Sequence, residues 1–95
     1  MTAEWRPRLR ENLVVRQVEE DVVVYDPVFD RTALLNFSAA VILELCDGSR
    51  TTREITRDLS ITFSLETREV TTDVDTVLGI LVGAGLLHAA NNVVP

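Results

Sequence analysis

Residues 34–59 read LLNFSAAVILELCDGSRTTREITRDL, and the spacing of apolar residues in this stretch decides the fold. Apolar residues recur at intervals of three and four, as on the buried face of an amphipathic helix, at Ala39, Ile42, Leu43 and Cys46. Asn36 precedes this stripe, and asparagine is a preferred N-cap because its side chain accepts a backbone hydrogen bond. Asp47-Gly48 follows the stripe and is a typical helix stop. We therefore expect a first helix between Asn36 and Asp47.

The second half of the same stretch contains a second helix start. Thr51-x-x-Glu54 has the pattern of a capping box, in which the two side chains satisfy each other's backbone N–H groups. Ile55 and Leu59 follow at a spacing of four residues. We expect a helix over residues 52–62 that buries these two side chains.

The chain before this stretch is rich in valine, which favours strands because its side chain is branched at Cβ. Residues 13–19 (LVVRQVE) and 21–25 (DVVVY) predict two strands, joined by an acidic hairpin connection. Asp26-Pro27 ends the second strand, because proline cannot donate to a sheet. A third short strand is expected over residues 31–35, which completes an antiparallel meander.

After the stretch, the helical period returns once more. Apolar residues at this period mark a third helix: Val70, Val74, Val77, Leu78 and Leu81. Gly83 and Gly85 end it, and Leu86-Leu87 is expected to pack back onto the core. The predicted fold class is α+β: a three-stranded antiparallel β-meander followed by three helices, similar to a winged helix-turn-helix. We expect a flexible N-terminal arm (residues 1–12), one domain (13–88) and a C-terminal tail (89–95).

The amino-acid composition reduces the number of possible functions. The chain has 95 residues, 46% of them hydrophobic and 25% charged, which is typical of one small folded domain and too apolar for disorder. Fifteen acids against nine bases give a net charge of −6. This balance disfavours a protein whose main task is binding phosphate backbones, since that requires clustered positive charge.

The inventory of reactive residues argues against an enzyme. One cysteine and one histidine exclude a disulfide framework and a zinc site of the usual Cys/His type. Cys46 lies on an apolar stripe beside acids, so we expect a buried, structural thiol. His88 is expected at the surface. We therefore predict no catalytic residue, no metal and no cofactor.

Neither end of the chain predicts membrane insertion. Residues 1–12 contain three arginines and no apolar core of a signal peptide. The apolar run of residues 77–87 is about half of the roughly 20 residues that a spanning helix needs. We expect a cytoplasmic protein that does not act at a membrane.

The third predicted strand suggests a binding site. It contains no proline and only one cation, so its edge can pair with another chain. We expect it to lie beside the third helix, which has more apolar residues than one helix face usually buries. A strand edge beside an apolar helix forms a groove to which an extended peptide can add as a further strand. Two alternatives stay open from the residues alone: a homodimer formed through the third helix with Gly79 and Gly83, and a winged-helix nucleic-acid binder.

Residues 34–59 also resemble the core signature of the PqqD family. In that signature a strand ends in Leu-Asn, a helix with Ala and Ile-Leu follows, and Asp-Gly-x-x-Thr leads into a short helix with Glu-Ile. The matching positions are Leu35-Asn36, Ala39-Ala40, Ile42-Leu43, Asp47-Gly48, Thr51 and Glu54-Ile55. Val70-x-x-x-Val74 with Gly85-Leu86-Leu87 resembles the family's last helix and closing segment, so the resemblance covers residues 13–88. Ala33-Leu34 departs from the family, which often has an aromatic residue before Leu-Asn.

The resemblance implies a non-catalytic peptide chaperone. Members of this family are similar to the RiPP recognition element, a domain that binds the leader of a ribosomally made precursor peptide. They present it to a modifying enzyme, often a radical SAM protein, as in pyrroloquinoline quinone biosynthesis. By this resemblance the leader adds along the third strand, in the cleft against the third helix. The implied peptide-binding residues are Arg31, Thr32, Ala33, Leu34 and Leu35 on the strand, with Asp75, Leu78 and Val82 as the helix wall.

The distribution of charge adds one expectation about the leader. Residues 1–20 contain four arginines and four acids, so residues 21–95 carry the whole net charge of −6. These residues would form the groove. A bound leader is therefore expected to be basic, or its binding to be sensitive to salt.

Overall fold

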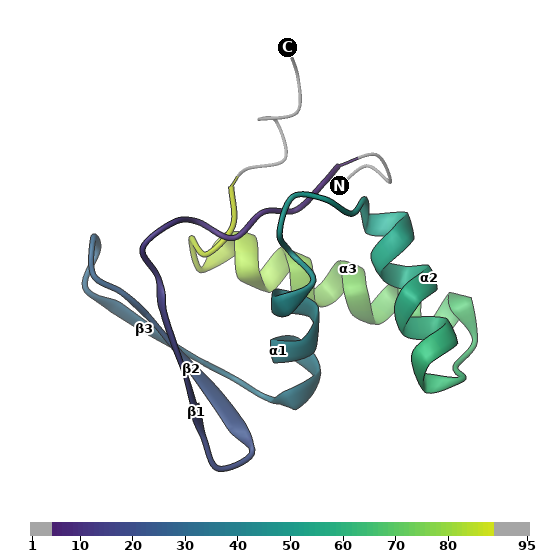
Figure 1. Cartoon of the computed structure of the whole chain (residues 1–95), viewed down its shortest axis with the longest axis horizontal. Helices are drawn as coiled ribbons and strands as arrows, with labels where there is room; N and C mark the ends of the chain where they lie inside the picture. The colour runs from purple at the N-terminus through teal and green to yellow at the C-terminus, as the bar shows by residue number, and fades with distance from the viewer. Residues whose placement is uncertain (1–4, 89–95) are drawn as a thin grey trace.

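The computed structural model describes residues 5–88, which form three strands followed by three helices (Figure 1). The elements, in chain order, are β1 (Val14–Val18), β2 (Asp21–Asp26), β3 (Arg31–Leu35), α1 (Phe37–Glu44), α2 (Thr52–Phe63) and α3 (Thr67–Gly83). The predicted α+β class and element order are confirmed, and each predicted strand lies within one residue of the observed bounds. The predicted tail over residues 89–95 lies outside the described residues.

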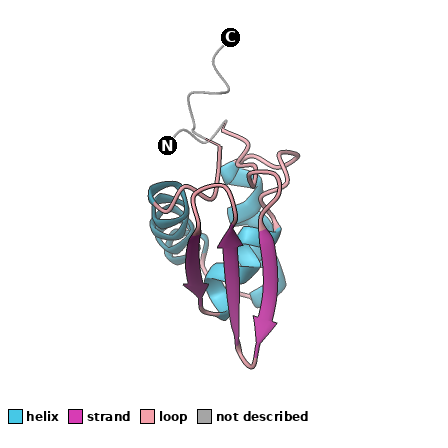
Figure 2. Cartoon of the chain, turned by 90° about the vertical axis from the view of Figure 1, so that its left-hand side faces the viewer, coloured by secondary structure: helices cyan, strands magenta, loops and turns pink. Residues whose placement is uncertain are grey.

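The sheet is an antiparallel meander in the order β1-β2-β3, so β1 and β3 are its two edges. Val24 of β2 lies opposite Val15 and Ala33, and its fully buried side chain points toward the helices. Val23 lies opposite Leu34 and points the other way. In Figure 2 the sheet is seen face-on with all the helices behind it. The sheet therefore has one packed face and one uncovered face.

Both helix starts expected from the sequence are present. The Asn36 side chain accepts a hydrogen bond from the backbone N–H of Ala39 at 2.9 Å. Thr51 and Glu54 form the complete capping box, with reciprocal bonds of 3.1 and 2.9 Å. These local signals place α1 and α2 at the positions expected from the sequence.

α1 lies between the sheet and the other two helices. α1 packs against β2, β3 and α3, while α2 packs against α3 on the far side from the sheet (Figure 1). The expectation that the third helix is the direct neighbour of the third strand is therefore corrected, because α1 is the helix that packs on β3. One continuous core results, formed by buried side chains that include Val24, Leu35, Ile42, Ile55, Val74, Leu78 and Leu81.

The N-terminal segment is part of this core, and here the prediction of a flexible arm is wrong for residues 5–10. The Trp5 side chain is 1% exposed and Pro7 is fully buried. The Trp5 carbonyl accepts a hydrogen bond from Thr52 N–H at 3.0 Å, and the Pro7 carbonyl accepts one from Gly48 N–H at 2.9 Å. The domain therefore begins no later than Trp5.

Beyond Pro7 the segment runs between two distant parts of the chain. Leu9 N–H donates to the Cys46 carbonyl, and His88 N–H donates to the Arg8 carbonyl, both at 2.9 Å. The sequence contained a signal for this arrangement. Apolar residues (Trp5, Pro7, Leu9) alternate with arginines, which is the period of an extended segment with one buried side.

Arg10 joins the end of this segment to the sheet. Its guanidinium forms an ion pair with the buried carboxylate of Asp26 at 2.9 Å and donates to the Gly85 carbonyl. It also lies 5.3 Å from the centre of the Phe29 ring. The hydrogen bond from Arg10 lowers the pKa of Asp26 below its usual value, so this carboxylate stays ionised. The pair holds the segment, β2 and the end of α3 together.

Replacing Trp5 tests whether the segment belongs to the domain. We expect Trp5→Ala to lower the free energy of unfolding by about 3–5 kcal/mol, because a buried aromatic side chain leaves a cavity. Val28→Ala is the control, since Val28 is 63% exposed, and its effect should stay within about 0.5 kcal/mol. Denaturant unfolding followed by circular dichroism measures both. Equal stability of Trp5→Ala and the unmodified chain would contradict the packing described.

Candidate functional site

Within residues 5–88 no strand pairs with the outer edge of β3. β3 pairs with β2 on one side only, because the sheet ends there. In an antiparallel ladder alternate residues point their N–H and C=O groups away from the partner, so the free edge of β3 presents a row of donors and acceptors. The Arg31 and Thr32 side chains are exposed, Ala33 is half-buried and Leu35 is buried. The strand is thus anchored by its last residue, and its edge is free to pair.

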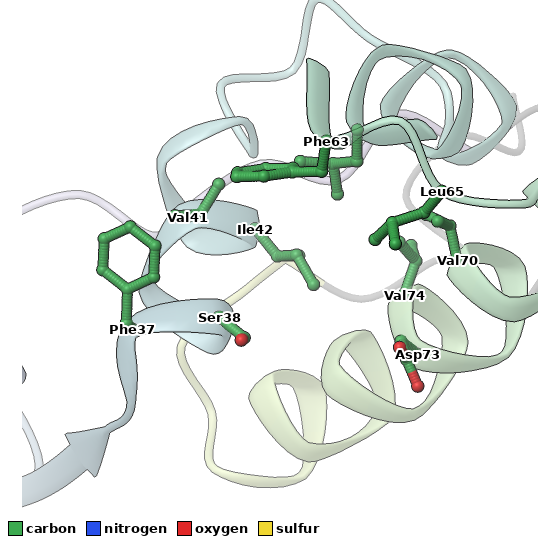
Figure 3. A pocket seen from close by; sticks show the side chains of 10 residues that line it. Phe37, Ser38, Val41, Ile42, Phe63, Leu65, Val70, Asp73 and Val74 are labelled. Atoms are coloured by element: carbon green, nitrogen blue, oxygen red, sulfur yellow. The ribbon is translucent and has the colours of Figure 1, made fainter. Parts of the chain in front are cut away.

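A groove begins where β3 ends. Asn36 separates Leu35 from Phe37, the first residue of α1, whose side chain is 64% exposed. Phe37 and Val41 form one wall of a cavity of about 350 Å³ (Figure 3). The other lining side chains come from the end of α2, the α2–α3 turn and the first half of α3: Phe63, Leu65, Val70, Asp73 and Val74. We call this cavity the apolar groove.

The wall formed by the α2–α3 turn is held in place by local hydrogen bonds. Ser64 adopts a left-handed conformation (φ 53°), which turns the chain sharply after α2. Leu65 N–H donates to the Ser60 carbonyl at 3.0 Å, and the Ser60 hydroxyl donates back to the Leu65 carbonyl at 2.5 Å. The turn therefore positions Phe63 and Leu65, which stay 47% and 49% exposed, as preformed apolar contacts. Exposed apolar side chains that gather around a cavity are typical of a binding site.

Asp73 is the one charged side chain in the lining of the apolar groove. It lies on α3, exposed, one residue before the buried Val74 (Figure 3). A carboxylate at the rim of an apolar cavity favours a ligand that carries a positive charge next to its apolar side chains.

Comparison with known proteins supplies the family. Residues 16–87 match the family model of coenzyme PQQ synthesis protein D (PqqD). The chain belongs to the PqqD family. No curated protein sequence matches it significantly.

Three solved structures have the same fold as this PqqD-family chain. TbiB1 in complex with the TbiA(beta) leader peptide is 18% identical, with a TM-score of 0.74 over 86% of this chain and 95% of that one. A lasso peptide synthetase B1 complexed with its leader peptide is 20% identical, with a TM-score of 0.75 over 88% and 99%.

The third structure is a member of the same family. It is a PqqD truncation from Methylobacterium extorquens PqqCD, described as a functional, stand-alone RiPP recognition element. It is 27% identical to this chain, with a TM-score of 0.72 over 87% of this chain and 88% of that one.

In this PqqD-family chain the residues expected to form the helix wall do not line the apolar groove. Leu78 is fully buried in the core, and Val82 is half-buried. Asp75 lies in a different cavity, between α3 and the α2 residues Arg53 and Arg57. Residues two apart on a helix point about 200° apart, so Asp73 and Asp75 face opposite sides of α3. Asp75, Leu78 and Val82 therefore lie outside the apolar groove, whose α3 residues are Val70, Asp73 and Val74, and their contact with a leader stays a prediction.

Some residues of the groove could have been recognised in the sequence as apolar residues that do not fit the buried stripes of the helices. Phe37 follows the N-cap Asn36, and Phe63 and Leu65 flank the turn after α2. All three are large apolar residues outside the buried stripes of their helices. Such residues point either to solvent or to a ligand, and the structure places them around one cavity.

The two reactive side chains lie away from the apolar groove. Cys46 is buried, and its thiol lies 3.1 Å from the Ile42 carbonyl. Burial raises the pKa of this thiol to about 12, with a further contribution from the Asp47 carboxylate. His88 Nε2 lies 3.4 Å from a carboxylate oxygen of Glu11. Within residues 5–88 no three His, Cys, Asp or Glu side chains are grouped as metal ligands.

The helices of the described segment were also compared with the requirements of a membrane crossing. Across residues 5–88, none is both long enough and apolar enough for one.

The pKa of Cys46 predicts its reactivity. At pH 8 only about one thiol in ten thousand should be ionised in the folded protein, against roughly a quarter in the unfolded chain, whose cysteine pKa is about 8.5. We expect labelling by a disulfide reagent to be roughly a thousandfold slower in native buffer than in denaturant. The rate should rise with pH up to the highest values at which the fold survives. Native labelling at the rate of the denatured chain would contradict the buried position.

Proposed function

We propose that this chain binds the leader of a ribosomally synthesised precursor peptide, which adds as a fourth strand along β3, and presents it to a modifying enzyme. The observation that carries the proposal is the continuity of the open β3 edge with the apolar groove at Phe37. Two structural neighbours are complexes with leader peptides, and a third is described as a RiPP recognition element. Membership of the PqqD family supports the same role.

The two parts of the site have different tasks. The β3 edge offers backbone hydrogen bonds, which any extended peptide can form, so it supplies affinity with little selectivity. The apolar groove can distinguish ligands, because it accepts large apolar side chains between Phe37, Phe63 and Val74. A peptide that pairs with β3 and passes Leu35 reaches this groove within one or two residues. The leader should thus combine an extended run with an adjacent apolar or aromatic side chain.

Charge selects further among such peptides. Asp73 in the groove and the net charge of −6 favour leaders with Lys or Arg beside the apolar residue. The carboxylates Glu69, Asp73 and Asp75 on the exposed sides of α3 also disfavour nucleic acid as an alternative ligand. The homodimer through Gly79 and Gly83 stays a prediction.

The chain itself carries out no chemistry in this proposal. The modifying enzyme, a radical SAM protein in the pyrroloquinoline quinone pathway or in a related peptide pathway, acts on the precursor that the domain holds in the cytoplasm. Ordering a flexible leader costs a few kcal/mol of the gross interaction energy, which keeps the complex reversible. A reversible complex allows the peptide to be released after modification.

Two neighbouring carboxylates provide a matched test of the groove. A fluorescent leader peptide with an extended run, one aromatic residue and an adjacent lysine is titrated with the unmodified chain, with Asp73→Asn and with Asp75→Asn. Asp73→Asn should weaken binding about two- to fivefold at low salt, the range of an exposed ion pair, and high salt should remove the difference. Asp75→Asn should have less effect, because it lies on the other side of α3.

The apolar wall gives a larger expected effect. Phe63→Ala should weaken the same leader about tenfold or more, since aromatic side chains in a cavity dominate such interfaces. Phe63 is 47% exposed, so this variant should keep its fold, which circular dichroism checks. Unchanged affinity in both Phe63→Ala and Asp73→Asn would overturn the assignment of the groove.

A further inference from the structure

A second cavity lies on the other side of α3 from the apolar groove. It has a volume of about 460 Å³ and is formed by one face of α2 and the facing side of α3. Its lining is polar and contains Arg53, Thr56 and Arg57 from α2, with Thr71 and Asp75 from α3. We call it the arginine cavity. Nothing in the proposed peptide-binding site uses it.

The two guanidinium groups of this cavity have no carboxylate partner among the described residues, unlike Arg50 just before α2. Arg50, in the loop before α2, pairs with Asp47 at 3.2 Å and with Asp58 at 3.5 Å. Neither Arg53 nor Arg57 has a carboxylate of residues 5–88 within 4.0 Å. Both are exposed and stand four residues apart on one helix face. Like charges at this spacing cost a helix a few tenths of a kcal/mol, so an outside counter-charge would stabilise them.

A third arginine adds to the same end of α2. The pKa of Glu54 lies below its usual value, first because of hydrogen bonds with Thr51 and then because Arg6 and Arg57 lie near it. Arg6 is therefore close to the start of α2, where the Trp5 carbonyl bonds to Thr52 N–H. The packed N-terminal segment thus brings a further cation near the first turn of α2. The lining of the arginine cavity itself contains two arginines and one carboxylate, on a chain whose net charge is −6.

We propose that the arginine cavity binds an acidic segment of a partner protein. Successive carboxylates suit two guanidiniums one helical turn apart, because each guanidinium can hold a carboxylate by two parallel hydrogen bonds. The Thr56 hydroxyl can donate to the same segment, whereas the Thr71 hydroxyl already donates to the Thr67 carbonyl. Asp75 in the lining, with the overall negative charge, repels a continuous polyanion such as nucleic acid more than a short acidic segment.

The inference does not depend on what occupies the apolar groove. The two cavities lie on opposite sides of α3. The charged residue of the apolar groove is Asp73, whereas the arginine cavity contains Arg53, Arg57 and one carboxylate, Asp75. A basic peptide and an acidic protein segment can therefore be bound at the same time without competing. Such a domain could connect the two.

The experiment uses a hexaglutamate peptide as the probe and the full ¹⁵N-labelled chain. At low salt we expect shifts of the Arg53 and Arg57 Nε–H signals and of the Thr56 and Thr71 amides, which high salt should abolish. The same titration is run with inorganic phosphate and with a short DNA duplex, which should bind at least tenfold more weakly than the peptide. Shifts that map elsewhere, or equal binding of phosphate or DNA, would overturn the proposal.

Variants complete the test. Arg53→Gln with Arg57→Gln should weaken hexaglutamate binding at least tenfold and leave the melting temperature equal or higher, because the two like charges are removed. Arg16→Gln is the matched control, since Arg16 is exposed on β1, far in the fold from α2, and should change the affinity less than twofold. Loss of binding in the control, or full binding in the double variant, would reject the site.

Discussion

One short turn, at residues 35–37, is the constraint on which the peptide site depends. Leu35 is buried and fixes the end of β3, while Asn36 bonds to Ala39 N–H and fixes the start of α1. Phe37 must then emerge at the rim of the apolar groove, directly after the open strand edge. A helix start displaced by one residue would rotate Phe37 and Val41 by about 100° and separate edge from groove. The Asn36 cap thus places the β3 edge, which pairs with the peptide backbone, directly beside the groove that selects its side chains.

The N-terminal segment connects parts of the domain that are far apart in the sequence. By packing Trp5 and Pro7 against the loop before α2, and by pairing Arg10 with Asp26, it connects sheet, loop and α3 in one unit. It also brings Arg6 near the first turn of α2. The polarity of the domain follows from this arrangement. Apolar residues and Asp73 surround the groove, and Arg53 and Arg57, with Asp75, line the cavity on the opposite side of α3.

Most of the fold was predictable because its signals are local. The valine-rich runs, the Asn36 cap and the Thr51–Glu54 capping box each act within a few residues and were confirmed. The N-terminal segment was missed because three arginines suggested a solvated arm, although Trp5, Pro7 and Leu9 alternate with them. The sequence does not show which surface these apolar residues pack against, and only the three-dimensional structure does.

The site was only half predictable for a different physical reason. The absence of proline and the single cation in β3 identify it as a strand whose edge can pair. These are properties of the strand's own sequence, so they can be predicted. Helix periodicity shows which residues share a face, but not which neighbour that face meets. Asp75, Leu78 and Val82 share a side of α3, yet that side meets α2 and the core, and Asp73 is the carboxylate at the groove. The position of α1 between β3 and α3 decides this, and it is a tertiary property.

The most direct measurement of the central claim is amide hydrogen exchange of the free and leader-bound chain, followed residue by residue by NMR. β3 and β1 are both open edges of the same sheet, so β1 serves as the internal control. Strand addition to β3 predicts that alternate amides within Arg31–Leu35 become protected when the leader binds, while those of Val14–Val18 exchange as before. Protection along β1, or binding without any change in the exchange of β3, would contradict the account.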